Sequence, residues 1–124
     1  MGYQEAISAA IGAHGLWKGR LRTAIDLRKS DFDPAVVAQK DQCAFGKWFY
    51  ALPPAVRLEP LPTEVESLHA SFHVEAAVVI QAALAGDKAA AERGLGEGSA
   101  YLDLSMKLVG TLMAWMKIVD QRSA

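Results

Sequence analysis

The residues best suited to chemistry in this sequence are its histidines and its cysteine. The 124 residues include three histidines, His14, His69 and His73, and one cysteine, Cys43. His69 and His73 are four residues apart, so on a helix their imidazoles share one face, one turn apart. Three nitrogens and one sulfur form a plausible tetrahedral zinc shell. Every histidine and thiol of the chain can therefore be assigned to one metal site.

Each of these residues also has a simpler interpretation. Alone, His14 would be a hydrogen-bonded core histidine, and Cys43 would be an inert, buried small side chain. Two core histidines one turn apart are different, because burying both imidazoles is costly unless each has a partner. A shared metal ion supplies that partner for His69 and His73 at once. We therefore favour a metal site with His14, Cys43, His69 and His73 as its ligands.

The predicted metal shell and the rest of the sequence argue against an enzyme. Three imidazoles and one thiolate leave no position for water or substrate, which a catalytic zinc ion needs. Ala70 stands where the glutamate of a metalloprotease His-Glu-x-x-His motif would be. The glycines near Gly94 lack the lysine and the hydroxyl residue of a phosphate-binding loop. One cysteine cannot attach haem, and a single Glu-x-x-His pair cannot build a di-iron site.

Apolar residues recur with the period of a helix through most of the chain. We predict helices over residues 5–28, 41–50, 63–85 and 88–121, with a further short helix after Asp33. The fold class is therefore all-α, an antiparallel four-helix-bundle-like domain with a short extra helix that carries Cys43. A thiol at the start of that helix would feel the positive end of the helix dipole, which favours the thiolate.

Sequence signals also suggest where the helices begin and end. Thr63 and Glu66 have the form of a capping box, so Thr63 should open the helix over residues 63–85. Gly86 should end that helix and Asp87 should cap the next. The glycines from Gly94 to Gly98 can kink the last helix or thin it for close packing.

The last helix has an apolar face too wide for one bundle to cover. Its predicted core stripe consists of Leu95, Leu102, Met106, Val109, Leu112, Met113, Met116 and Val119. Four further apolar residues lie outside this stripe, namely Leu104, Leu108, Trp115 and Ile118. We therefore predict a homodimer.

Length, composition and charge exclude several functional classes. The chain is expected to form a single domain over residues 1–124, and 52% of its residues are hydrophobic. A formal net charge of −1 and the lack of a basic tract argue against nucleic-acid binding. The N-terminus lacks the form of a signal peptide, and charges interrupt the apolar run over residues 101–119, so we expect no membrane partner. We predict a cytoplasmic protein.

Three blocks of the sequence resemble one known family in the same order. They are Ala13–Lys18, Cys43–Tyr50 and His69–His73. They are similar to the His-x-x-Trp, Cys-x-(Phe/Leu)-Gly-x-Trp and His-x-x-(Phe)-His patterns of the chemoreceptor zinc-binding (CZB) domain of bacterial signalling proteins. We expect the chain to be a standalone member, without an attached output domain.

The resemblance implies a zinc-binding, often dimeric helical bundle with His14, Cys43, His69 and His73 as ligands. The residues expected to surround the site are Trp17, Phe45, Gly46, Trp48 and Phe72. Family members regulate chemotaxis receptors or diguanylate cyclases, which are the expected signalling partners. Some sense zinc, and others sense hypochlorous acid through the zinc-bound cysteine.

Two functions remain open at this stage. The first is a zinc-dependent signalling module for chemotaxis or related regulation, in which Cys43 is the redox switch. Zinc would hold Cys43 as a nucleophilic thiolate, and its oxidation would weaken the metal–sulfur bond and free the segment that carries it. The second is a structural zinc bundle that serves for dimerisation or docking and does not respond to oxidant.

Overall fold

The computed structural model describes residues 2–123 and shows only helices among them. The helices are α1 (Tyr3–Gly15), α2 (Trp17–Leu27), α3 (Pro34–Val37), α4 (Ala44–Tyr50), α5 (Pro54–Arg57), α6 (Pro60–Leu84), α7 (Lys88–Leu95) and α8 (Ala100–Ser123). The prediction of an all-α fold is confirmed. Within this part of the chain, no helix is both long enough and apolar enough to cross a bilayer.

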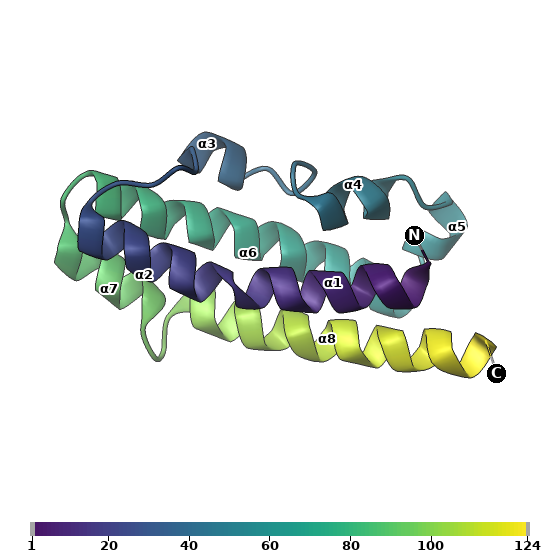
Figure 1. The fold of residues 1–124 in the computed structure, drawn as a ribbon. Coiled ribbons are helices and arrows are strands. Elements are labelled where there is room, and N and C mark those ends of the chain that lie inside the picture. Colours follow the sequence, from purple (N-terminus) through teal and green to yellow (C-terminus); the bar gives the residue numbers. More distant parts are fainter. Residues whose placement is uncertain (1, 124) are drawn as a thin grey trace.

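The body of the bundle consists of the long helices α6 and α8 and of α1 continued by α2 (Figure 1). Helix α8 contacts both α1 and α6. The segment with α3, α4 and α5 runs back along the bundle and takes the fourth position, where α3 contacts α6 and α4 contacts α1. Because this segment crosses the length of the molecule, α6 runs in the same direction as α1 and α2, and α8 runs against them. The short helix α4 is the predicted extra helix, with Cys43 directly before it.

The first predicted helix is divided, because Leu16 separates α1 from α2. Leu16 keeps right-handed helical dihedrals, and its side chain is 61% exposed. Gly15 precedes it, and glycine is a poor helix former. Because Leu16 keeps helical dihedrals, the two helices remain nearly coaxial (Figure 1). The face of α1 that carries His14 continues into the buried face of α2.

The long helix α6 does not begin where the capping-box pattern indicates. Its first residue is Pro60, whose fixed φ suits the first turn, and Glu59 is the N-cap residue. The Thr63 hydroxyl instead donates a hydrogen bond to the Arg57 carbonyl, so the predicted start at Thr63 is wrong. The predicted end is confirmed, since Gly86 has a φ of +81°.

The last predicted helix is two helices, which changes its buried face. Gly98 has a φ of +80°, and residues 96–99 separate α7 from α8. The helical periodicity therefore restarts at Ala100, and this restart determines which residues of α8 are buried. A stripe of core residues counted continuously from Leu95 does not match the buried face of α8. The predicted stripe is wrong in part: Met106 and Met113 are 69% and 55% exposed, whereas Leu108 and Trp115 are in the core.

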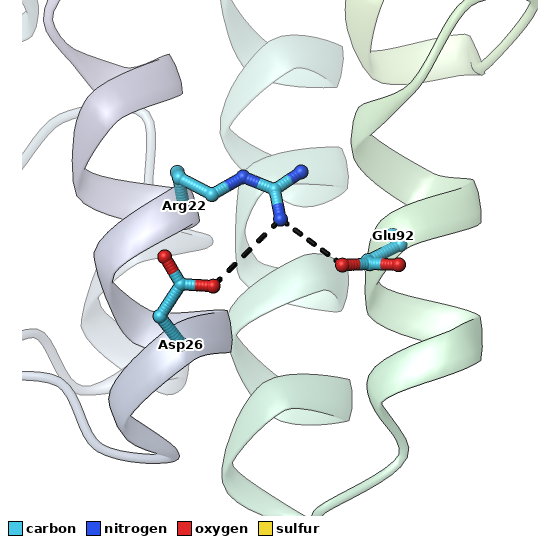
Figure 2. Close-up of polar contacts among 3 residues, drawn as sticks. All are labelled: Arg22, Asp26 and Glu92. Carbon is cyan, nitrogen blue, oxygen red and sulfur yellow. Dashed lines mark hydrogen bonds and ion pairs between the residues drawn. The ribbon is translucent and has the colours of Figure 1, made fainter.

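An exposed ion-pair cluster joins α2 to α7 (Figure 2). Arg22 Nη1 lies 3.1 Å from Glu92 Oε1 and 3.9 Å from Asp26 Oδ1. Beneath it, buried apolar side chains of α2 and α7 form part of the core, among them Leu21 and Leu95. This end of the bundle is held by ordinary apolar packing and a surface ion pair.

Candidate metal centre

Three elements bring the four predicted ligand residues together. His14 lies in the last turn of α1, Cys43 is the N-cap residue of α4, and His69 and His73 lie on one face of α6. One donor atom from each residue can be chosen so that all four atoms lie within 4.8 Å of one another. The three imidazoles are buried, and Cys43 is half-buried.

Donor atoms of the cysteine and of the α6 pair lie close to one another. His69 Nε2 lies 3.0 Å from His73 Nε2 and 3.3 Å from Cys43 Sγ. His73 Nδ1 lies 2.9 Å from the Val37 carbonyl oxygen. A carbonyl can only accept, so the proton of neutral His73 is on Nδ1 and its Nε2 carries a lone pair. That lone pair points at the centre of the cluster.

His14 is oriented by its own helix. Its Nδ1 lies 2.7 Å from the Ala10 carbonyl oxygen, so this nitrogen donates. Its Nε2 is then an acceptor, and it is buried without a hydrogen-bond partner among the described residues. Burying an unpaired polar atom costs free energy, so this orphaned lone pair needs a ligand. Donation from the second ring nitrogen to a backbone carbonyl is a usual support for a histidine that binds metal.

The start of α4 fixes the thiol. The Gly46 amide donates a hydrogen bond to Cys43 Sγ at 3.3 Å, as in a side-chain N-cap. A Cβ at Gly46 would clash with the Lys40 carbonyl oxygen and lie 3.0 Å from Asp41 Cα. Only glycine therefore fits where the chain folds back over the first turn of α4. The position of the Cys43 sulfur depends on this close approach.

Burial keeps the imidazoles neutral. Desolvation lowers the pKa of His14 to about 4, although the hydrogen bond to the Ala10 carbonyl opposes this shift. Desolvation, followed by nearby positive charge, lowers the pKa of His69 to about 2. Burial also lowers the pKa of His73, while its bond to the Val37 carbonyl opposes this shift. At neutral pH all three rings are therefore available as neutral ligands.

The thiol differs from the sequence-based expectation. Burial raises the pKa of Cys43, and the backbone hydrogen bonds at the start of α4 lower it by less. The helix N-terminus therefore does not make a thiolate by itself, and the expectation that it would is wrong for the metal-free chain. A bound cation would supply the missing charge, because a thiol that coordinates a metal is deprotonated.

Aromatic rings pack around the cluster. The ring centroid of Phe45 lies 5.1 Å from that of His69, and the centroid of Phe72 lies 5.2 Å from that of His14. Trp17 lies farther out, with its centroid 6.4 Å from that of His73. Trp48 packs on Phe45 and against Tyr3 and Trp115. These rings give the centre a largely apolar wall.

Sequence reasoning missed two backbone groups that orient the rings. The Ala10 carbonyl is one helical turn before His14, so the helical periodicity could have indicated it. The Val37 carbonyl belongs to α3, which is 36 residues from His73, and no local signal pointed to it.

A comparison with protein-family models matches residues 14–80 to the chemoreceptor zinc-binding domain. Comparisons with curated proteins and with solved structures give no match. The matched range begins at the first candidate ligand, includes the other three and covers more than half of the chain. Imidazole and thiolate donors are also those that zinc prefers, so the expected cofactor is Zn²⁺. The chain belongs to the chemoreceptor zinc-binding domain family.

Proposed function

We propose that the chain is a zinc-dependent signalling module in which His14, Cys43, His69 and His73 bind one Zn²⁺ ion. The observation that carries this proposal is the orientation of the histidines. The Nδ1 atoms of His14 and His73 face backbone carbonyls, so their Nε2 lone pairs are left for a ligand. Four protein donors fill a tetrahedral shell, which favours a structural or sensing role over catalysis.

We infer further that Cys43 is a redox switch. Bound zinc holds the sulfur as a thiolate and ties the start of α4 to α1 and α6. The Cys43 sulfur can donate an electron pair to hypochlorous acid, which forms cysteine sulfenic acid and releases chloride. Half-burial leaves the Cys43 side chain partly accessible to so small an oxidant. Sulfenic acid is a poorer ligand, so oxidation releases α4 from the histidines.

The test of this switch measures zinc and cysteine oxidation in the same sample. The zinc-loaded protein is titrated with hypochlorous acid while a chromogenic chelator reports free zinc and peptide mass spectrometry reports Cys43 oxidation. We expect zinc release to follow the oxidation of Cys43. The exposed Met106 and Met113 are competing targets, so Met106→Leu/Met113→Leu is the matched control and should respond as wild type. Release that disappears in this control would reject the switch.

A structural zinc bundle for docking or dimerisation is the alternative, and the closed four-donor shell favours it. It predicts that oxidant at physiological concentration changes nothing and that zinc removal unfolds the whole protein. The switch predicts a local change, because the core of α1, α2, α6 and α8 is apolar without the metal. Hydrogen exchange with and without chelator separates the two. Faster exchange confined to residues 34–50 supports the switch, and global exchange supports the alternative.

We also propose that the module pairs with a second copy and acts in the cytoplasm on a chemoreceptor or a diguanylate cyclase. Support for pairing comes from Met106 and Met113, which lie two turns apart on the same exposed face of α8. This face replaces the one expected from the sequence, since Leu108 and Trp115 are buried in the chain's own core. Light scattering tests this proposal by measuring the molar mass of the protein in solution. Met106→Glu should shift a dimer toward monomer, whereas Ser71→Glu, at an exposed position of α6, should not.

A further inference from the structure

A cavity of about 530 Å³ lies between α1 and the segment that carries Cys43. Its volume falls within the range of about 300–1,000 Å³ that is typical of small-molecule sites. One wall is built from small side chains of α1, among them Ala9 and Ala13. The opposite wall includes Val36 and Phe45. Most of its lining residues lie outside the ligand set proposed above.

The lining is apolar except for a few groups, and one of them is a cation. The Arg20 guanidinium borders the cavity and stacks on two rings, with Cζ 5.0 Å from the ring centroid of Trp17 and 5.1 Å from that of Phe32. Arg20 takes part in none of the ion pairs found among residues 2–123. No acidic side chain of that range lines the cavity. The cavity therefore presents one positive charge that takes part in no ion pair among these residues, beside an apolar chamber.

We propose that this cavity binds a small amphipathic monocarboxylate. Its apolar body lies against the alanines of α1 and the rings of Trp17 and Phe45, and its carboxylate accepts hydrogen bonds from Arg20. Guanidinium groups bind carboxylates with paired N–H donors. A single arginine with no lysine in the lining suits one negative charge better than a phosphate dianion.

The position of the cavity connects such a ligand to the metal centre. His14, Cys43 and His73 also line it. An occupant touches α1 and α2 on one side and the segment with α3 and α4 on the other. It therefore holds the Cys43 segment against the bundle, which makes the cavity a place for a second, chemical input to the same module.

Octanoate is the probe, and 1-octanol is its neutral counterpart. Both are titrated into the full chain, zinc-loaded and after chelation, with affinity from calorimetry and location from amide chemical shifts. We expect octanoate to bind the zinc-loaded protein more tightly than 1-octanol, and to shift the amides of Ala9, Ala13 and Val36. Absence of octanoate binding in both metal states overturns the cavity proposal without bearing on zinc. Shifts centred on Met106 and Met113 also overturn it.

Two pairs of variants test the head group and the chamber separately. Arg20→Gln should raise the octanoate Kd about tenfold and leave 1-octanol unchanged, because it removes a charge-assisted hydrogen bond. Lys18→Gln removes an exposed charge of the same helix that does not line the cavity, and it should change neither. Equal effects of the two variants overturn the role of Arg20.

Ala9→Leu adds bulk within the chamber and should weaken both probes, whereas Ala114→Leu, on the exposed side of α8, should weaken neither. If a second copy fills the cavity instead, octanoate will not bind and Ala9→Leu will dissociate a dimer, which overturns the proposal.

Discussion

Two regions of the bundle are held together in different ways. Where α2 meets α7, buried apolar residues such as Leu21 and Leu95 make the contact, and Arg22 and Glu92 bridge its surface. Where α1, α4 and α6 meet, the centre of the contact is three imidazoles and a thiol. The first region is complete as it stands. The second contains a buried nitrogen, His14 Nε2, that no described group satisfies.

This difference separates residues that stabilise the fold without a ligand from residues whose packing depends on a bound metal ion. Polar groups buried at the metal centre cost free energy unless a ligand satisfies them. Metal binding and local packing are therefore linked there, as they are in other metal-dependent domains. The α2–α7 end has no such dependence, so a change at the metal should remain local.

Removing one ligand should have the largest effect and should act only on the metal centre and its surroundings. His69→Ala is expected to raise the zinc Kd by more than about 100-fold, beyond the 10–100-fold typical of losing an outer hydrogen-bond partner. Competition with a chromogenic chelator measures this. Ser71→Ala, exposed on the same helix, is the control and should bind zinc as wild type does. A zinc Kd for His69→Ala within threefold of wild type would contradict the proposed shell.

Acid should destabilise the metal-free protein through the same residues. The folded pKa values of His14 and His69 lie below the usual 6.5, so below that pH the unfolded chain binds more protons. Stability is therefore complete above pH 6.5 and falls as the pH drops toward the folded values, by at most about 1.4 kcal/mol per pH unit for each histidine. Urea unfolding at pH 7.5 and pH 5 in the presence of chelator measures the loss. The metal-free His14→Leu variant should lose less, and an equal loss would exclude His14 as a contributor.

Crowding the turn over α4 should have an intermediate effect. Gly46→Ala places a methyl group against the Lys40 carbonyl. The shifts that such overpacking forces typically lower the free energy of unfolding by about 1–3 kcal/mol. We expect a lower urea midpoint and weaker zinc binding, because the Cys43 sulfur moves. The matched variant is Gly19→Ala in α2, where a Cβ meets nothing within 4 Å. It should stabilise the helix by up to about 1 kcal/mol. A Gly46→Ala protein with unchanged zinc affinity would show that this turn does not position the thiol.

The smallest effect is expected at the end of the bundle where α2 meets α7. Arg22→Gln removes an ion pair whose side chains are 47% and 45% exposed, and such pairs contribute about 0–1 kcal/mol. The midpoint of urea unfolding should therefore shift little, and the zinc Kd should not change. A zinc Kd altered more than threefold by this variant would show that the metal centre and the α2–α7 contact are coupled.

Residue type and spacing were enough to predict the metal cluster, because His69 and His73 share a helix face and His14 and Cys43 were the remaining donors. Helix ends and registers were less predictable. Pro60 starts α6 ahead of Thr63, and the break at Gly98 resets the face of α8. The charge state of Cys43 was also missed, since burial outweighs the helix N-terminus and depends on the whole fold. In each of these cases tertiary packing outweighs a local sequence signal. Tertiary packing depends on residues far apart in the sequence, so a local pattern cannot predict the outcome.

Whether the four residues share one zinc ion can be measured by X-ray absorption at the zinc edge of the zinc-loaded protein. We expect one zinc ion per chain with about three nitrogen neighbours at about 2.0–2.1 Å and one sulfur at about 2.3 Å. A shell without sulfur, or one completed by water oxygen, would contradict this expectation.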